Sequence, residues 1–275
     1  LKNIKPEKAD SISSGSISID INSGIGGIPV GRVTELFGVE ASGKTTLSQH
    51  IIASAQKLGI LCAFVDTEQS IDLLYAEKCG VDIQNLILSQ PDSLETALGL
   101  TEDLIVEPEV GLIVFDSVVG ISPEKESEDD LGAANVSLIS KLMTKFFRRN
   151  LFKIRDTKTT LIFTNQVRDK IGAYIPTLDT TGGHALKHSA SLRIQTKKGK
   201  EVKDGDISIA SEIEAVFRKN RVGPPYRTAN FEVYFDRGIW KPADILRNAV
   251  DYGIVKMRGS YFTFEGNTIA QGKLK

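Results

Sequence analysis

The segment Gly38–Thr45, which reads G-V-E-A-S-G-K-T, constrains the fold of this chain more than any other feature. It fits the pattern G-x-x-x-x-G-K-[ST] and lies between an apolar run at Val33–Phe37 and a helical apolar spacing over Thr45–Leu58. Glycines in such a loop let backbone N–H groups turn inward around phosphate oxygens, and the start of a helix adds a favourable dipole. The sequence therefore predicts a strand, a phosphate-binding loop and a helix in succession, and this context argues against a chance match.

The same loop predicts individual contacts with a nucleotide. Lys44 is expected to reach the β- and γ-phosphates, and the Thr45 hydroxyl is expected to bind Mg²⁺. The full set of nucleotide contacts predicted here is Gly38, Glu40, Ala41, Ser42, Gly43, Lys44, Thr45 and Thr46.

Two carboxylates follow other apolar runs and complete a candidate hydrolytic site. Asp116 ends the run Leu112–Phe115, where it would share Mg²⁺ with Thr45. Glu68 follows the run Ile60–Val65 and is the candidate base for an attacking water. Asp66 competes for that role, and a helix N-cap is the plain structural alternative for Glu68.

An amide is the third polar group of this predicted site. Gln166 lies in Thr164–Gln166, directly after an expected strand at Thr160–Phe163. There it could detect the γ-phosphate and pass that information to the following loop, although a simple turn is the alternative. Together these residues indicate a machine driven by ATP or GTP.

The spacing of apolar runs predicts the fold class. Short runs that are apolar on both faces are typical of buried parallel strands, and helical patterns separate them. These strands are Val33–Phe37, Ile60–Val65, Leu86–Leu88 and Gly111–Phe115, and the helices are Thr45–Leu58, Ser93–Val106 and Asn135–Leu151. This alternation predicts an α/β fold with a doubly wound, mostly parallel sheet.

The pattern changes along the rest of the chain. Strand-like runs at Leu192–Gln195, Ile207–Phe217 and Phe231–Phe235 have no helices between them, which predicts an antiparallel extension of the sheet. We expect a core over residues 1–240, of which 1–30 are polar and turn-rich, and a small, partial C-terminal α+β lobe over 241–275, beginning with a helix at Ala243–Val250.

Composition narrows the setting of the protein. Lys and Arg number 34 against 35 Asp and Glu, so the bulk charge does not indicate nucleic acid or a membrane surface, and any DNA site must be local. No apolar run approaches the roughly 20 residues needed to cross a bilayer. Cys62 and Cys79 match no metal-binding spacing and are expected to be buried thiols of a cytoplasmic protein.

These residues occur together in a recognisable order, and the chain resembles bacterial-type RecA recombinases over nearly all its length. The segments that carry the resemblance are 31–46, 63–68, 161–168, 180–187, 219–221 and 266–273. The resemblance implies an ATPase of the P-loop class that uses ATP and Mg²⁺. It also implies a helical homo-oligomeric filament on single-stranded DNA that pairs with double-stranded DNA and exchanges strands in recombination and repair.

The resemblance also implies roles for single residues. Glu68 matches the catalytic glutamate, and Gln166 matches the glutamine that couples ATP to a DNA-binding loop. Asp72 and Tyr75 match adenine contacts. Lys219 and Arg221 match a cation pair that reaches the ATP of the neighbouring subunit, although the residues alone favour a solvated strand end.

Two segments resemble DNA-binding loops, near residues 123–136 and 168–184. The first is acidic, so its end and the following helix are the better candidates for contacts. The implied DNA contacts are Val136, Lys141, Arg148, Arg168, Lys170, Gly172, Tyr174, Thr181, Gly182, Gly183 and His184. A plain solvated face is an equal alternative for the helix cations, to which Arg149 also belongs.

Departures from the family pattern leave other readings open. Residue 1 is Leu, and the segments that would match the family's N-terminal helix and most of its C-terminal lobe are not in this sequence, which leaves open whether the sequence is trimmed or a short natural variant. His188 stands where the family has an interface Phe, which would weaken filaments. The alternatives are a ring-forming motor with the same core, such as a helicase or branch-migration ATPase, and a weakly catalytic accessory protein. Whether a self-cleaving repressor is a further partner stays open.

Overall fold

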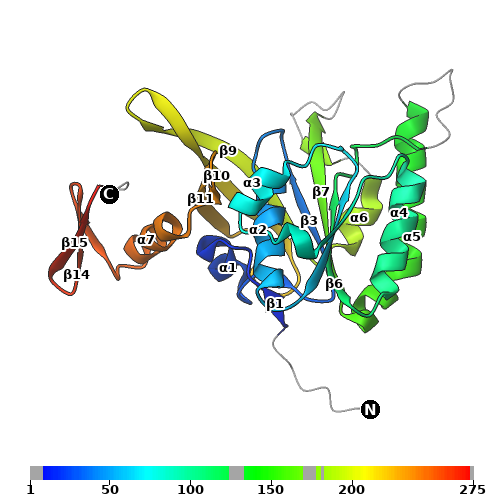
Figure 1. The fold of residues 1–275 in the computed structure, drawn as a ribbon, viewed down its shortest axis with the longest axis horizontal. Helices are drawn as coiled ribbons and strands as arrows, with labels where there is room; N and C mark the ends of the chain where they lie inside the picture. The colour runs from blue at the N-terminus through cyan, green and yellow to red at the C-terminus, as the bar shows by residue number, and fades with distance from the viewer. Residues whose placement is uncertain (1–8, 124–132, 170–177, 181–182, 273–275) are drawn as a thin grey trace, which may run out of the picture.

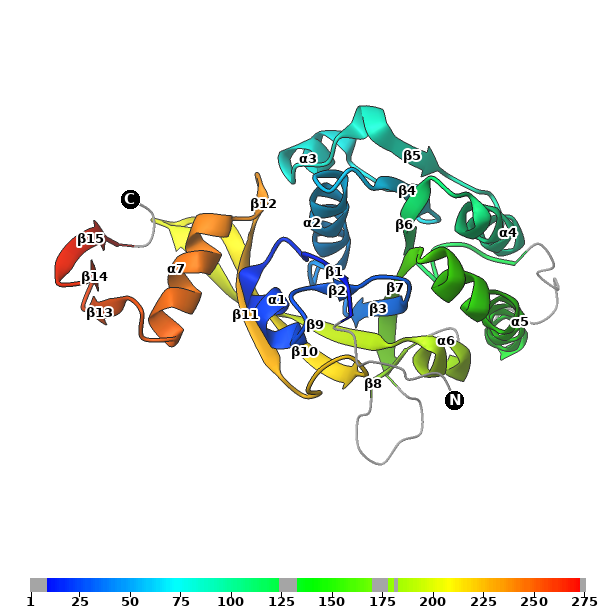
Figure 2. The same cartoon turned by 90° about the horizontal axis from the view of Figure 1, so that it is seen from below.

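The computed structural model describes residues 9–123, 133–169, 178–180 and 183–272. A large sheet crosses the molecule in the order β12-β11-β10-β9-β3-β7-β6-β4-β5, and β8 pairs with β7 (Figures 1 and 2). Its strands are β3 (Val33–Gly38), β4 (Leu61–Asp66), β5 (Leu86–Ser89), β6 (Val110–Asp116), β7 (Thr160–Asp169), β8 (Leu178–Thr180), β9 (Leu192–Asp204), β10 (Ile207–Asn220), β11 (Thr228–Tyr234) and β12 (Gly238–Ile239).

The strands from β9 to β5 in this order run parallel, and β10, β11 and β12 continue the sheet antiparallel. The predicted doubly wound sheet with an antiparallel extension is therefore confirmed. The helices of the chain are α1 (Ile17–Ser23), α2 (Lys44–Gln56), α3 (Leu73–Lys78), the 3-10 turn η1 (Ile83–Asn85), α4 (Leu94–Val106), α5 (Ala133–Thr157), α6 (Gly183–Ser189) and α7 (Lys241–Asp251).

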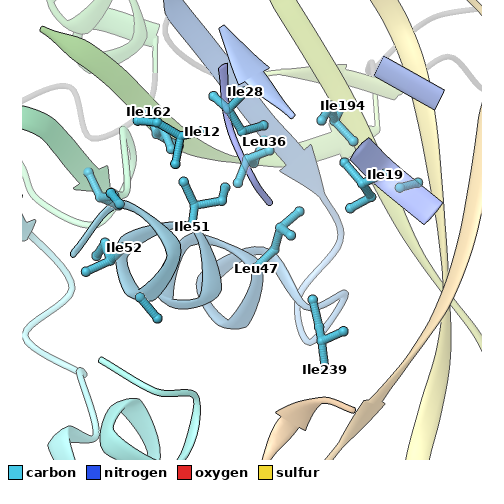
Figure 3. Packing of buried hydrophobic residues seen from close by; sticks show 14 of the residues in the cluster. Ile12, Ile19, Ile28, Leu36, Leu47, Ile51, Ile52, Ile162, Ile194 and Ile239 are labelled. Atoms are coloured by element: carbon cyan, nitrogen blue, oxygen red, sulfur yellow. The ribbon is translucent and has the colours of Figure 1, made fainter. Parts of the chain in front are cut away.

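Helices cover both faces of the parallel part, and each face has its own apolar core. Leu47 and Ile51 of α2 pack with Leu36 of β3 on one face, as Figure 3 shows. On the other face α4, α5 and α6 cover a second cluster, where the ring centroids of Phe147 and Phe163 lie 5.4 Å apart. Burial of these two apolar layers is the main stabilising term of such a fold.

Two sequence expectations were wrong in detail. Leu86–Leu88 was expected to be buried on both faces, but β5 is an edge strand in which Ile87 and Leu88 are 36% and 37% exposed. The first 30 residues are polar and turn-rich, and their pattern predicts no helix or strand, but they contain α1 and a hairpin of β1 (Ser11–Ile12) and β2 (Ile28–Pro29). A seven-residue helix is too short to show a periodic pattern, and packing of its buried side chains holds it in place.

Several elements run further than their apolar patterns. β7 continues through Thr164–Gln166, and β9 extends to Asp204, where it forms a long hairpin with β10 (Figure 1). The far part of β9 consists largely of exposed charged residues, so hydrophobicity does not reveal it, whereas the hydrogen-bonded ladder with β10 defines it.

The C-terminal part contains α7 and a small antiparallel sheet of β13 (Lys256–Arg258), β14 (Tyr261–Phe264) and β15 (Asn267–Gln271). Arg247 of α7 forms ion pairs with Glu212 of β10 and Glu232 of β11, at 3.0 and 2.9 Å. In the described part of the chain no helix has the length and apolar character that crossing a bilayer requires.

A buried histidine joins α2 to the edge of the sheet. The Ile239 N–H of β12 donates to Nε2 of His50 at 2.8 Å, and a side chain at Gly238 would collide with the ring. Burial, followed by the charges of Lys241 and Lys57, lowers the pKa of His50 from 6.5 to about 4. The folded protein therefore holds this imidazole neutral at pH values where the unfolded chain protonates it.

This histidine predicts an acid-sensitive contribution to stability. Because its pKa is depressed on folding, the contribution is complete above about pH 6.5 and falls by about 3 kcal/mol as the pH drops to about 4. Urea unfolding at pH 7.0, 5.5 and 4.5 measures the dependence. The His50→Gln variant is expected to depend on pH less steeply than the original chain. Equal slopes for the two proteins would contradict the assignment, and their comparison cancels the titration of the carboxylates.

Candidate nucleotide and DNA sites

The loop after β3 has the closed form that its glycines predict. A side chain at Gly38 would collide with the Thr196 carbonyl, and Gly43 has φ of 82°, which favours glycine. The Ser42 hydroxyl donates to the Val39 carbonyl at 2.7 Å and lies 2.8 Å from the Thr196 hydroxyl. The loop is therefore fixed against β9 before α2 begins.

Lys44 lies over this loop. Its Nζ donates to the carbonyls of Val39 at 2.8 Å and Gly38 at 3.3 Å. Burial lowers the pKa of Lys44, and the charges of Asp116, Glu68 and Glu40 partly oppose that effect. The ammonium group thus faces the carboxylates of the same sheet edge.

Asp116 and Thr45 lie together, as a shared cation would require. The Thr45 hydroxyl donates to Oδ2 of Asp116 at 2.6 Å, and the Thr164 hydroxyl donates to Oδ1. Burial raises the pKa of Asp116, while these two hydrogen bonds act in the opposite direction. One carboxylate and one hydroxyl fit Mg²⁺, which takes oxygen ligands and completes its shell with water and phosphate. Among the described residues no group of three or more His, Cys, Asp or Glu forms a self-sufficient metal site.

Glu68 and Gln166 meet at the same edge of the sheet. Oε1 of Glu68 accepts from the Ser117 hydroxyl at 2.5 Å and from Nε2 of Gln166 at 3.5 Å. Glu68 is exposed, so it can reach a water and a phosphate. Gln166 belongs to β7, which excludes the alternative that it lies in a simple turn.

The structure places the competitor Asp66 in the interior, where it is less accessible to a water than Glu68, and it contradicts the N-cap alternative for Glu68. Asp66 is buried, and its Oδ2 accepts from the Ile71 N–H at 3.1 Å and from Nε2 of Gln90 at 2.9 Å. These two hydrogen bonds of Asp66 fix the chain that follows β4. The N-cap of the next helix is Asp72, which accepts from the Tyr75 N–H at 3.0 Å, so Glu68 does not cap a helix.

Tyr75 lies at the other end of the loop, close to α2. Its hydroxyl is 3.4 Å from the Thr46 hydroxyl and donates to the Tyr234 carbonyl at 3.4 Å. Burial raises the pKa of Tyr75 to about 12, so the phenol is neutral. The half-buried Tyr75 thus lies beside the start of α2, and Asp72 caps the helix that carries it.

The structure does not bring Lys219 and Arg221 to this loop. Strand register pairs Lys219 with Arg193, and Arg193 with Glu35 near the start of β3, whereas the loop follows the end of β3. Nζ of Lys219 donates to the carbonyls of Lys187 at 2.6 Å and His188 at 3.0 Å, at the end of α6. Burial, followed by the charges of Arg221 and Arg193, lowers the pKa of Lys219 to about 8. Both cations therefore lie toward the edge of the sheet where the parallel strands begin, opposite the edge where these strands end and the nucleotide loop lies.

Some of the implied DNA contacts lie on two helices, α5 and α6. Lys141 and Arg148 are exposed on α5, but Arg149 pairs with Glu102 of α4 at 3.0 Å and is less suited to DNA. His184 is exposed on α6, and Gly183 begins that helix with φ of 72°, where a side chain would meet the Ser140 hydroxyl at 2.5 Å.

Other implied contacts are less fully described. Arg168 lies in β7 opposite Asp179 of β8. Val136 is in α5, and its side chain lies outside the described structure. Lys170, Gly172, Tyr174, Thr181 and Gly182 fall outside the described residues.

Sequence reasoning missed the hydroxyl groups that hold the site together. Ser117 orients Glu68, Thr164 orients Asp116, and Thr196 closes the loop through Ser42. The only signal in the sequence was position, because Thr164 directly follows a predicted strand and Ser117 directly follows Asp116 at the end of another.

Comparison with known proteins agrees with this geometry. Residues 1–240 match the family model of the RecA N-terminal domain. The chain is 44% identical to Protein RecA of Fusobacterium nucleatum over 267 residues, which cover 97% of this chain and 71% of the relative. It is 44% identical to Protein RecA of Campylobacter fetus over 269 residues, covering 97% and 78% of the two chains. For Protein RecA of Streptomyces venezuelae the identity is 42% over 268 residues, covering 97% and 71%.

These similarities extend over nearly the whole chain, and they do not favour the ring-forming motor or the accessory protein. The chain belongs to the RecA family of recombinases, whose members are DNA-dependent ATPases.

Proposed function

We propose that this protein binds ATP and Mg²⁺ at the edge formed by the loop after β3, Asp116 and Glu68, and forms a helical filament on single-stranded DNA. The filament pairs that strand with homologous duplex and exchanges strands. The observation that carries the proposal is the contact of Glu68 with Gln166, because it joins a water-activating carboxylate to the strand that leads into a DNA-binding segment.

Each residue of the nucleotide site has a separate role in the hydrolysis of ATP. Loop N–H groups and Lys44 hold the phosphates, while Asp72 and Tyr75 border the adenine. Thr45 and Asp116 would hold Mg²⁺, which would neutralise charge on the phosphates. Glu68 accepts a proton from the attacking water, whose oxygen bonds to the γ-phosphorus as the bond to the β–γ bridging oxygen breaks. The products are ADP and inorganic phosphate.

Lys219 and Arg221 act on the ATP of the neighbouring subunit. Their position at the opposite edge of the sheet supports this role, since a head-to-tail filament brings opposite edges of two copies together. Two cations at the developing γ-phosphate charge stabilise the transition state only after assembly.

DNA is bound by segments 123–136 and 168–184 with the adjoining exposed cations Lys141 and Arg148. Cationic, aromatic and backbone N–H donors suit single-stranded phosphates and base faces. Residues 241–275 are part of a C-terminal lobe beside a core over 1–240. The protein acts in the cytoplasm, in the response to DNA damage, where stimulation of a self-cleaving repressor would be a further role.

Steady-state ATP turnover tests the proposal directly. Addition of single-stranded DNA is expected to raise turnover at least about tenfold. Electron microscopy of the same samples is expected to show helical filaments on the DNA. Equal turnover with and without DNA, on visible filaments, would reject the coupling. Closed rings of fixed subunit number would instead favour a motor of the helicase type.

A further inference from the structure

A buried ion pair lies beneath the DNA-binding segments and is not used by the nucleotide site. Glu35 of β3 is fully buried, and its carboxylate accepts from Nε of Arg193 on β9. Nδ2 of Asn165, the residue before Gln166 on β7, donates to the same carboxylate at 2.9 Å. A buried charge pair of this kind persists only where hydrogen bonds satisfy both partners, so the three side chains form a fixed cluster.

The guanidinium of Arg193 extends this cluster to a second DNA-binding segment. Its Nη2 donates to the Thr180 hydroxyl at 3.4 Å, and its Cζ lies 4.5 Å from the centroid of the Phe37 ring. Thr180 ends β8, which pairs with β7 at the base of the segment 168–184. The side chain of Arg193 is 15% exposed, so it connects interior groups and does not present a free cation to DNA.

Arg193 is also the strand partner of Lys219. The two residues lie opposite each other in β9 and β10. A second connection runs through α6, which begins at Gly183 and whose last carbonyls hold Nζ of Lys219. The base of the DNA-binding segment is thus joined to Lys219 through α6 and through Arg193.

We propose that Arg193, held in place by Glu35, is the positioning residue through which DNA bound beside β8 acts on both ATP sites. The effect passes through Asn165, next to Gln166 in the same subunit, and through Lys219, which faces the neighbouring subunit. The planar fork of Arg193 suits this task because one guanidinium binds the carboxylate and the hydroxyl in fixed directions. The inference deepens the proposed function and rests on the roles given there to Gln166 and Lys219.

The first test removes the hydrogen bond between Arg193 and the DNA-binding segment. Thr180→Val keeps the branched shape of the side chain, leaves the Glu35–Arg193 pair intact and deletes the hydroxyl. Because Thr180 is buried and its hydroxyl accepts from Arg193, the change removes an interior contact and no exposed DNA-binding group. The maximal stimulation by single-stranded DNA should fall about fivefold or more, while the DNA concentration that gives half of it stays the same. Thr263→Val, which removes a strand hydroxyl that donates to the Lys256 carbonyl at 3.2 Å, is the matched control and should change nothing.

A second variant tests whether Arg193 is the transmitting group. Arg193→Lys keeps the charge next to Glu35 but loses the fork, so it should reduce stimulation as Thr180→Val does. The variant with both changes should lose no more DNA stimulation than the more impaired of the two single variants, because both changes break the same connection. Additive losses would overturn the inference.

The outcomes separate this inference from the proposed function. If DNA does not stimulate turnover of the unmodified chain, both the proposed function and this inference are wrong. Normal stimulation of Thr180→Val overturns the inference alone. It is also overturned if Thr180→Val changes only the half-saturating DNA concentration, which would make Thr180 a DNA contact. A loss of basal turnover in proportion would make its role structural.

Discussion

Glu68→Gln is expected to lower DNA-stimulated ATP turnover by about 10³-fold, because a glutamine of the same shape cannot accept a proton from water. The Ser117 hydroxyl can still donate to the amide oxygen that replaces Oε1, so the side chain should keep its place. Binding of ATP should stay within about twofold of the original value, since Lys44 and the loop are untouched. Turnover by phosphate release and binding by a fluorescent ATP analogue measure the two effects.

Two controls make this result specific. Glu77→Gln removes an exposed carboxylate of α3 and should leave turnover unchanged. Asp66→Asn tests the competing carboxylate. We expect Asp66→Asn to destabilise the fold at the turn after β4, where Asp66 accepts two hydrogen bonds, with turnover per folded molecule less affected than in Glu68→Gln. A larger loss of turnover per folded molecule for Asp66→Asn would transfer the role of base to Asp66.

The sequence alone predicts those parts of the site where backbone geometry restricts the residue type. Gly38 and Gly43 are such positions, because a side chain at Gly38 collides with β9 and Gly43 has a positive φ. Asp116 is predictable for a related reason, since it ends an apolar strand and the ends of neighbouring parallel strands meet at one edge.

Other features leave no such trace in the sequence. Ser117 and Thr164 orient the two carboxylates, but serine and threonine occur in many surface turns, so neither residue type identifies its role. The ion pair of Glu35 and Arg193 joins strands that are distant in the sequence, and a charge within an apolar run indicates no partner. The position of Lys219 follows only from strand register, which is why residues alone favour a solvated strand end.

Lys219→Ala with Arg221→Ala is expected to lower turnover by about 10²-fold or more, since the pair stabilises transition-state charge in the neighbouring site. The double variant should still bind ATP, because both cations lie at the edge of the sheet away from the nucleotide loop. Lys203→Ala, which removes an exposed cation of the long hairpin, is the control and should keep full turnover.

Mixing two inactive variants shows on which subunit these cations act. Subunits with Glu68→Gln supply an intact Lys219 and Arg221, while subunits with both cations replaced supply an intact Glu68. If the cations cross the interface, an equal mixture recovers about a quarter of the original turnover, because random head-to-tail assembly pairs the two intact halves at that frequency. If the cations act within their own subunit, no site in the mixture is complete and turnover stays at the level of the variants. Recovery should disappear when the proteins are assembled separately on DNA and then mixed, because each filament then contains one kind of defective interface.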